Sequence, residues 1–237
     1  MKHLFRFLGN KASDGTWSLR GDEVTHLLKV VRLTENDEFE VADENGSVAK
    51  CRYKKLSKSA IELDVLDQCY VDSETNVCDL FLGAIAPKDF DEILPALVEM
   101  GLSSVHLFGQ KSSGKQRLQN KAERYDRIID SAMKQSKRAY RMELKVHPDL
   151  ETAVSTYKGS TKVEGCYFLD ASEADRLHEV SKTVGRCCVV VGGEAGLSEY
   201  EIQFLRSSGF KGANLGKNIL RARTAAIVAP WEILSRI

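Results

Sequence analysis

The chain has 237 residues, of which 43% are apolar and 29% are charged, and its 34 basic side chains balance 34 acidic ones. This composition is typical of a soluble globular protein and excludes a disordered chain, while the zero net charge gives no general attraction to polyanions. No apolar run reaches the ~18 residues of a membrane span, and the first ten residues lack the apolar stretch of a signal peptide, so we expect a cytoplasmic protein with no membrane partner.

Residues 1–72 alternate short apolar and polar positions, as in Phe39-Glu40-Val41 and Ile61-Glu62-Leu63, with a turn sequence at 43–46 between two such runs. This alternation predicts antiparallel strands. The segment 22–32 differs, because its apolar side chains recur at helical spacing. We therefore expect a small β-barrel that carries one helix and ends near residue 72.

From residue 73 to 237, nearly continuous apolar runs alternate with helical patterns. Strands that are apolar on both faces predict an α/β fold, a parallel sheet covered by helices on both sides. We expect strands at 78–85, 103–108, 143–147, 165–170, 187–192 and 211–215, and helices at 89–100, 120–139, 149–157, 172–182, 199–208 and 221–236. Ser198 and Glu201 are spaced as a capping box, whereas Pro95 and Pro230 should kink their helices or shift the boundaries.

The six cysteines form no C-x-x-C pair and no Cys/His spacing typical of zinc. Several of them lie in apolar strand-like runs. We expect reduced core thiols and no metal.

A basic stretch runs from Gln110 to Lys145, with eleven Lys and Arg residues against four acidic residues. An excess of positive charge of this kind can bind the phosphates of a nucleic acid. Judged by charge alone, a solvated helix face is the more common explanation.

Three junctions where a predicted strand meets a loop lie near the C-terminus, at 169–172, 191–198 and 215–221. In an open parallel sheet, ligands bind beyond the carboxyl ends of the strands. The glycines of the second junction would let the backbone approach a ligand closely, although a glycine-rich turn of this type is structural about as often as it is functional.

The segment Gly109–Lys115 matches the spacing of a phosphate-binding P-loop. The next residue is Gln116, where a Ser or Thr hydroxyl is needed for Mg²⁺, and the helical pattern begins only near Asn120. These differences argue against nucleotide hydrolysis.

Two motifs near the C-terminus resemble those of the ribosomal RNA small subunit methyltransferase E family, I-G-P-E-G-G-(F/L)-S-x-x-E and L-G-x-x-I-L-R-x-E-T-A. Here they read V-G-G-E-A-G-L-S-x-x-E from Val191 and L-G-x-x-I-L-R-x-R-T-A from Leu215. Upstream, the family's R-F/Y, H-x-x-x-V-L-R and W-x-R-I-x-x-x-A-x-x-Q-S/C-x-R elements have counterparts at Arg6, 26–33 and 125–138, so the resemblance spans nearly the whole chain. Three positions depart from the family pattern: Gly193 replaces Pro, Ala195 replaces Gly and Arg223 replaces Glu.

The resemblance implies a PUA-like RNA-binding barrel at 1–72 and a SPOUT domain at 73–237 whose chain passes through a trefoil knot. It also implies a homodimer that uses S-adenosyl-L-methionine (SAM) to methylate N3 of a uridine in 16S rRNA, within the assembled small subunit. Two alternatives remain open: an RNA-binding protein of the same fold without catalysis, and a SPOUT methyltransferase that acts on another RNA nucleotide.

The resemblance also implies roles for particular residues. Arg221 and Glu194 are the expected catalytic residues. The expected SAM-binding residues are Leu169, Gly192, Gly193, Glu194, Gly196, Leu215, Gly216, Ile219, Leu220, Thr224 and Ala225. The expected RNA-binding residues are Arg6, Lys29, Arg32, Lys134, Lys137 and Arg138.

Overall fold

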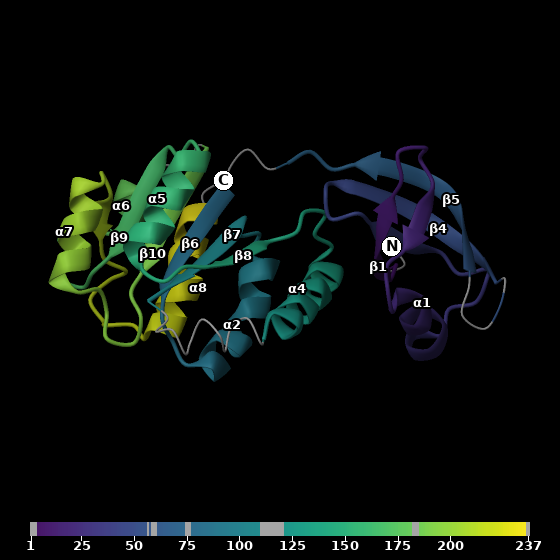
Figure 1. The fold of residues 1–237 in the computed structure, drawn as a ribbon, viewed down its shortest axis with the longest axis horizontal. Helices are drawn as coiled ribbons and strands as arrows, with labels where there is room; N and C mark the ends of the chain where they lie inside the picture. Colours follow the sequence, from purple (N-terminus) through teal and green to yellow (C-terminus); the bar gives the residue numbers. More distant parts are fainter. Residues whose placement is uncertain are drawn as a thin grey trace. The chain divides into compact units, whose positions relative to one another are not determined.

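The structure, a computed structural model, describes residues 4–55, 57, 61–73, 77–109, 121–181 and 185–235. The chain divides into two compact units (Figure 1): unit 1 holds Met1–Ser73 and Asp130–Arg141, and unit 2 holds Glu74–Ile129 and Met142–Ile237. Residues 130–141, which the sequence pattern placed with the second domain, thus pack with the first. The P-loop-like segment lies outside the described residues beyond Gly109.

Unit 1 is built on a five-stranded sheet in the order β2-β1-β3-β4-β5. Its strands are β1 (Arg6–Lys11), β2 (Trp17–Leu19), β3 (Phe39–Ala42), β4 (Ser47–Lys55) and β5 (Ile61–Tyr70). Neighbouring strands are antiparallel as predicted, except that β1 pairs with β3 in parallel. Phe7, Trp17, Leu27 and Phe39 form the centre of its core.

The helix predicted at 22–32 is present but changes its pitch. It begins as α1 (Glu23–Thr25) and continues as a π-helix, η1 (His26–Val31), which buries Leu27. Arg32 ends it in the left-handed conformation, with φ 59°. Such a conformation is uncommon for a side chain other than Gly, Asn or Asp.

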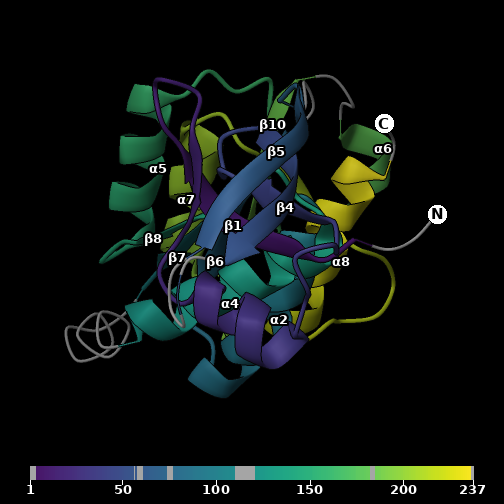
Figure 2. The ribbon, with the colours of Figure 1, turned by 90° about the vertical axis from the view of Figure 1, so that its right-hand side faces the viewer.

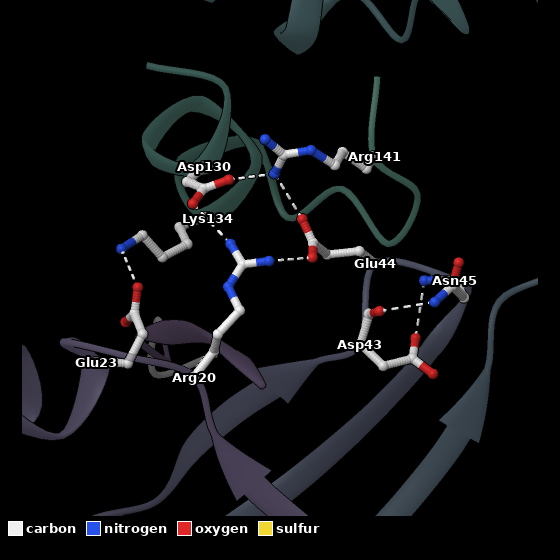
Figure 3. Close-up of polar contacts among 8 residues, drawn as sticks. All are labelled: Arg20, Glu23, Asp43, Glu44, Asn45, Asp130, Lys134 and Arg141. Carbon is white, nitrogen blue, oxygen red and sulfur yellow. Dashed lines mark hydrogen bonds and ion pairs between the residues drawn. The ribbon is translucent and has the colours of Figure 1, made fainter. Parts of the chain in front are cut away.

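A ring of alternating charges attaches the segment 130–141 to the barrel (Figure 3). The Arg20 guanidinium contacts Glu44 and lies 2.6 Å from Asp130, and the Arg141 guanidinium contacts the same two carboxylates, at 2.6 Å from Glu44. Burial alone would lower the pKa of Arg141, but hydrogen bonds to Asp130 and Glu44 raise it, so the guanidinium stays charged. Lys134 adds a further pair with Glu23, at 2.6 Å.

Unit 2 contains a six-stranded sheet in the order β11-β9-β10-β6-β7-β8, and all of its strand pairs are parallel. The strands are β6 (Val77–Gly83), β7 (Ser104–Phe108), β8 (Glu143–Val146), β9 (Gly165–Leu169), β10 (Arg186–Val191) and β11 (Lys211–Ala213). The helices are α2 (Pro87–Glu99), α4 (Ala122–Ser136, whose first eight residues belong to this unit), α5 (Leu150–Ser160), α6 (Leu177–Val180), α7 (Glu199–Ser207) and α8 (Ala222–Leu234). Figure 2 shows α5 and α7 on one side of the sheet and α6 and α8 on the other.

The predicted parallel sheet and its covering helices are confirmed, with one helix as the exception. A helix was predicted at 172–182, and of its described residues, 172–181, only α6 is helical. Residues 172–175 lie in turns and bends, and Arg176 forms a β-bridge with Asn214. The backbone there is bonded elsewhere, because the Asp170 carboxylate accepts the Ser172 N–H and the Asn214 amide donates to the Glu173 carbonyl. Side chains that bond the backbone locally compete in this way with helix formation.

Two further sequence expectations concern the helix ends and the prolines. Ser198 and Glu201 form the predicted capping box of α7. Pro95 and Pro230 lie inside α2 and α8, which continue through them, so the boundaries of these helices are not shifted. None of the helices in the described ranges is both long and apolar enough to cross a membrane.

A buried polar network lies at the amino ends of the central strands of unit 2. The Asp79 carboxylate, fully buried, accepts hydrogen bonds from Ser104 Oγ and Tyr157 Oη, both at 2.5 Å, and a bidentate pair from Arg186. His106 Nε2 lies 3.0 Å from Ser104 Oγ. Burial, with a smaller contribution from the nearby His147, lowers the pKa of His106 from 6.5 to about 4.

This low pKa makes unit 2 sensitive to acid. Because the unfolded chain binds a proton at His106 near pH 6.5 and the folded chain only near pH 4, stability is complete above pH 6.5 and falls as the pH drops toward 4. The loss should not exceed about 3 kcal/mol. Urea unfolding across this range should show a steeper decline for wild type than for His106→Gln, and identical slopes would contradict the assignment.

The charge ring should stabilise unit 1 measurably. Arg141→Ala leaves Glu44 and Asp130 partly buried without one cation, and we expect it to cost about 2 kcal/mol of the free energy of unfolding. Trp17 reports on unit 1 when the only other tryptophan is changed by Trp231→Phe. The control is Lys50→Ala, which removes a more exposed ion pair with Glu38. An equal decrease in the free energy of unfolding in both variants would show that the ring stabilises unit 1 no more than an exposed ion pair does.

Candidate active site

Three loops line one pocket at the carboxyl ends of β9, β10 and β11 in unit 2. The first follows Leu169, the second runs from Val191 to Leu197, and the third runs from Asn214 into the start of α8. These are the three junctions singled out in the sequence, and the parallel sheet brings them together because the ends of its parallel strands meet at one edge.

Glycine backbones in close contact form one wall of the pocket. A Cβ atom on Gly192 would lie 2.5 Å from the Gly196 carbonyl carbon and 2.7 Å from the Leu197 nitrogen. A Cβ on Gly83 would meet the backbone of Gly193 in the same way, well inside van der Waals contact. Gly196 also has φ 79°, which favours glycine. The loop therefore folds back on itself through backbone contacts that leave no room for side chains, and the Gly196 N–H donates to the Gly193 carbonyl at 3.0 Å.

Polar side chains hold the other two loops. The Asn214 carboxamide oxygen accepts the Gly216 N–H at 2.8 Å, and its nitrogen donates to the Glu173 carbonyl at 2.7 Å. Gly216 has φ 127°, so the third loop turns sharply directly after β11. Asn214 thus links the first and third loops beside the pocket.

Arg221 and Glu194 both line the pocket and are held in different ways. Arg221 is the N-cap residue of α8, where its carbonyl accepts the N–H groups of Thr224 and Ala225, both at 2.9 Å. Within the described ranges its guanidinium has no ion-pair or hydrogen-bond partner. The Glu194 carboxylate accepts the Ala86 N–H at 3.0 Å, which fixes it to the start of α2.

The pocket gathers nearly all the predicted SAM-binding residues. Those that line it are Leu169, Gly192, Gly193, Glu194, Gly196, Leu215, Gly216, Ile219, Leu220 and Ala225. Thr224 is not among the lining residues and is exposed on the first turn of α8. Asn214 and Ala222 also line the pocket and were not predicted; their only signal in the sequence is that they flank the third loop.

The predicted RNA-binding residues divide into two groups in unit 1. Arg6 has a side chain only 8% exposed and pairs with Glu40, which Lys137 also contacts at 2.9 Å. Burial would raise the pKa of Glu40, but the hydrogen bond from Lys137 and the charge of Arg6 outweigh it and lower that pKa. Together with Lys134, which pairs with Glu23, these cations have internal partners.

The other predicted RNA-binding residues are more open. Lys29 and Arg32 are exposed, and Arg138 is half-buried two residues after the end of α4. The Arg32 side chain donates to the Lys29 backbone carbonyl at 3.4 Å, at the end of η1. The described ranges hold no group of three or more His, Cys, Asp or Glu residues able to bind a metal ion.

The close approach of Gly192 to the second loop generates a prediction. In Gly192→Ala the new methyl group must displace the backbone at Gly196 and Leu197, and we expect SAM affinity to fall by at least about tenfold. Gly159→Ala, in α5 with open space around it, should bind SAM as wild type does. Calorimetry with SAM measures both variants, and wild-type affinity in Gly192→Ala would show that the loop tolerates the shift.

Comparison with known proteins extends over the whole chain. The model of the RNA methyltransferase domain family matches residues 73–232, and that of the RNA methyltransferase PUA domain matches residues 19–66. The ribosomal RNA small subunit methyltransferase E of Aquifex aeolicus is 29% identical over 212 residues, covering 88% of this chain and 90% of that protein. Its namesake from Synechocystis is 28% identical, covering 93% of this chain and 73% of that protein.

Solved structures show the same fold. A ribosomal RNA small subunit methyltransferase E from Neisseria gonorrhoeae, bound to S-adenosyl methionine, superposes with a TM-score of 0.82 at 23% identity and covers 99% of this chain and 98% of its own. A probable rRNA methyltransferase from Porphyromonas gingivalis gives 0.83 at 24% identity, with 98% of both chains covered. The α/β fold with a PUA-like first domain and the family resemblance seen in the sequence are thereby confirmed. With two thirds of its length matched by the domain model, this chain belongs to the RNA methyltransferase family.

Proposed function

We propose that the protein is a SAM-dependent methyltransferase that methylates N3 of a uridine in small-subunit rRNA. The observation that supports this most is the convergence of three loops at one edge of the parallel sheet, in a chain of the RNA methyltransferase family. Arg221 lines this pocket and has no ion-pair partner among the residues that the structure describes. The relatives from Aquifex aeolicus and Synechocystis are named for action on small-subunit rRNA.

The pocket residues suit SAM as the cofactor. Leu169, Leu215, Leu220 and Ala225 offer apolar contacts for the adenine, and the glycine loop offers backbone groups for the ribose and the amino-acid part. Gly192 has no room for a side chain because the backbone of Gly196 and Leu197 lies against it, so the loop keeps the shape of this pocket wall only with glycine at that position. When bound, SAM supplies a methyl group on a positively charged sulfur, which departs with the bonding electron pair as the methyl group transfers.

Arg221 and Glu194 are the proposed catalytic residues. Removal of the N3 proton places negative charge on O2 and O4 of the uracil, and the guanidinium of Arg221, with no other partner in the described part of the chain, stabilises that charge. Glu194 uses one carboxylate oxygen to bond Ala86, and its second oxygen is available to accept the N3 proton. The lone pair on N3 then forms the new bond to the methyl carbon.

The barrel of residues 1–72 is the proposed RNA-binding domain. Lys29 and Arg32, exposed at the end of η1, are the first candidates for phosphate contacts, followed by Arg138. The remaining three cations are paired with carboxylates, and RNA phosphates could bind them only by displacing those carboxylates. They are Arg6, Lys134 and Lys137. Their contribution is therefore to hold the segment 130–141 in place, and their effect on RNA affinity is indirect.

We also propose a homodimer, a trefoil knot and a place in the cytoplasm. The exposed apolar side chains of Trp231 and Ile219, 54% and 87% accessible, support association of two copies through the region of α8. The knot would involve the loops at 191–198 and 215–221. The substrate would be the assembled small subunit in the cytoplasm, and sedimentation equilibrium tests the dimer directly.

The function is tested with tritiated SAM and small ribosomal subunits that lack the N3-methyluridine mark. Label in the rRNA and a new reverse-transcription stop at one uridine would support the proposal, because a methyl group on N3 blocks base pairing. Label without a stop at a uridine would identify another target nucleotide. Failure to label any RNA, with SAM bound, would favour an RNA-binding protein without catalysis.

Arg221→Ala separates catalysis from cofactor binding. Loss of one donor to a developing oxyanion typically lowers kcat by about 10²–10³-fold, and we expect that loss here with SAM affinity changed by less than about threefold. Single-turnover methylation and calorimetry measure the two quantities. Equal losses in turnover and affinity would exclude the catalytic role, and Arg206→Ala, on α7 outside the pocket lining, is the control.

A further inference from the structure

Arg223, which reverses the charge expected from the family motif, forms a two-point contact between two helices. Its Nη1 atom lies 3.1 Å from Asp89 Oδ1 and 3.3 Å from Glu92 Oε2. Arg223 is the second residue of α8, and the two carboxylates stand on the first and second turns of α2. The contact therefore joins the beginning of one helix to the beginning of the other.

Electrostatics favour this contact at the start of α8. The N-terminal end of a helix carries partial positive charge, which disfavours cations there. The first turn of α8 has no acidic residue, and Arg223 follows the cationic N-cap Arg221. The carboxylates of Asp89 and Glu92 supply the missing negative charge from α2.

The same part of α2 also holds the glycine loop of the pocket. The Glu194 carboxylate accepts the Ala86 N–H at 3.0 Å, and the Gly193 and Ala84 backbones lie against each other. Residues 84–92 therefore connect to the second pocket loop through Glu194 and to the third, at the start of α8, through Arg223.

We propose that Arg223 is a positioning residue for the methyl-transfer reaction: through Asp89 and Glu92 it fixes the start of α8, and with it Arg221, against the glycine loop. The proposal rests on the proposed function of the pocket. Arg223 itself does not line the pocket, so it acts through Arg221 and does not contact the reacting atoms. A misplaced Arg221 should lower the rate of the chemical step more than the affinity for SAM, since Leu169 and the glycine loop, which supply half of the predicted SAM-binding residues that line the pocket, lie outside α8 and the loop before it.

The test is a charge reversal and its compensation. Arg223→Glu places three carboxylates together, and we expect kcat to fall by about 30-fold while KM for SAM changes by less than about threefold. The triple variant Asp89→Lys, Glu92→Lys, Arg223→Glu should recover kcat to within about threefold of wild type, as should Arg223→Lys alone. Lys211→Ala, which removes an exposed pair with Asp175 elsewhere in unit 2, should leave kcat unchanged.

Wild-type kcat in Arg223→Glu would overturn the proposal, and so would equal changes in kcat and KM. Arg223→Gln removes the positive charge without introducing repulsion, so it tests the proposal even if the triple variant does not fold. We expect its kcat to fall by about tenfold. An unchanged kcat would also overturn the proposal.

Hydrogen exchange over residues 221–226 gives a readout that needs no substrate. Arg223→Gln should speed exchange there and Lys211→Ala should not; equal protection in Arg223→Gln and wild type would overturn the proposal. A wild-type protein that labels no RNA, with faster exchange in Arg223→Gln, would instead reject the proposed function alone.

Discussion

Direct backbone contact at Gly83, Gly192 and Gly193 is the constraint on which the pocket depends. The ends of β6 and β10 approach so closely that a single added methyl group would collide with main-chain atoms. Side chains that would otherwise separate the loops are absent, so the loop after β10 can fold back on itself at Gly196. The loop folded in this way lines the pocket at the carboxyl end of β10.

The net charge of this protein is zero, so its charged side chains act through local ion pairs. In unit 1, the ring of Arg20, Glu44, Asp130 and Arg141 consumes part of the positive charge of the basic stretch to attach residues 130–141 to the barrel. In unit 2, Arg223 is likewise paired with two carboxylates, whereas Arg221 has no ion-pair partner in the described part of the chain. The Arg221 guanidinium, which lines the pocket, therefore keeps its charge available there with respect to the described residues.

The polar residues around Asp79 and those of the pocket lie at opposite edges of the sheet of unit 2. Asp79 and His106 are buried at the amino ends of the strands, where the partly exposed Arg186 pairs with Asp79, so their contribution is to stability. The pocket lies at the opposite, carboxyl edge, where the side chains are more open. A parallel sheet allows this division because all of its strands present the same end at the same edge.

Sequence by itself determined the alternation of strands and helices and the three junctions, because apolar periodicity and glycine-rich turns report on local structure. Most of the pocket residues were expected only from the resemblance of the two C-terminal motifs to a known family. Apolar periodicity failed at 172–182, where the distant side chain of Asn214 takes up a backbone carbonyl that a helix would have used. The assignment of 130–141 to unit 1, and the internal partners of Arg6, Lys134 and Lys137, were decided by tertiary structure alone. Ion pairs between residues 34 to 111 positions apart leave no periodic signal in a sequence, and only the folded chain selects which carboxylate each cation meets.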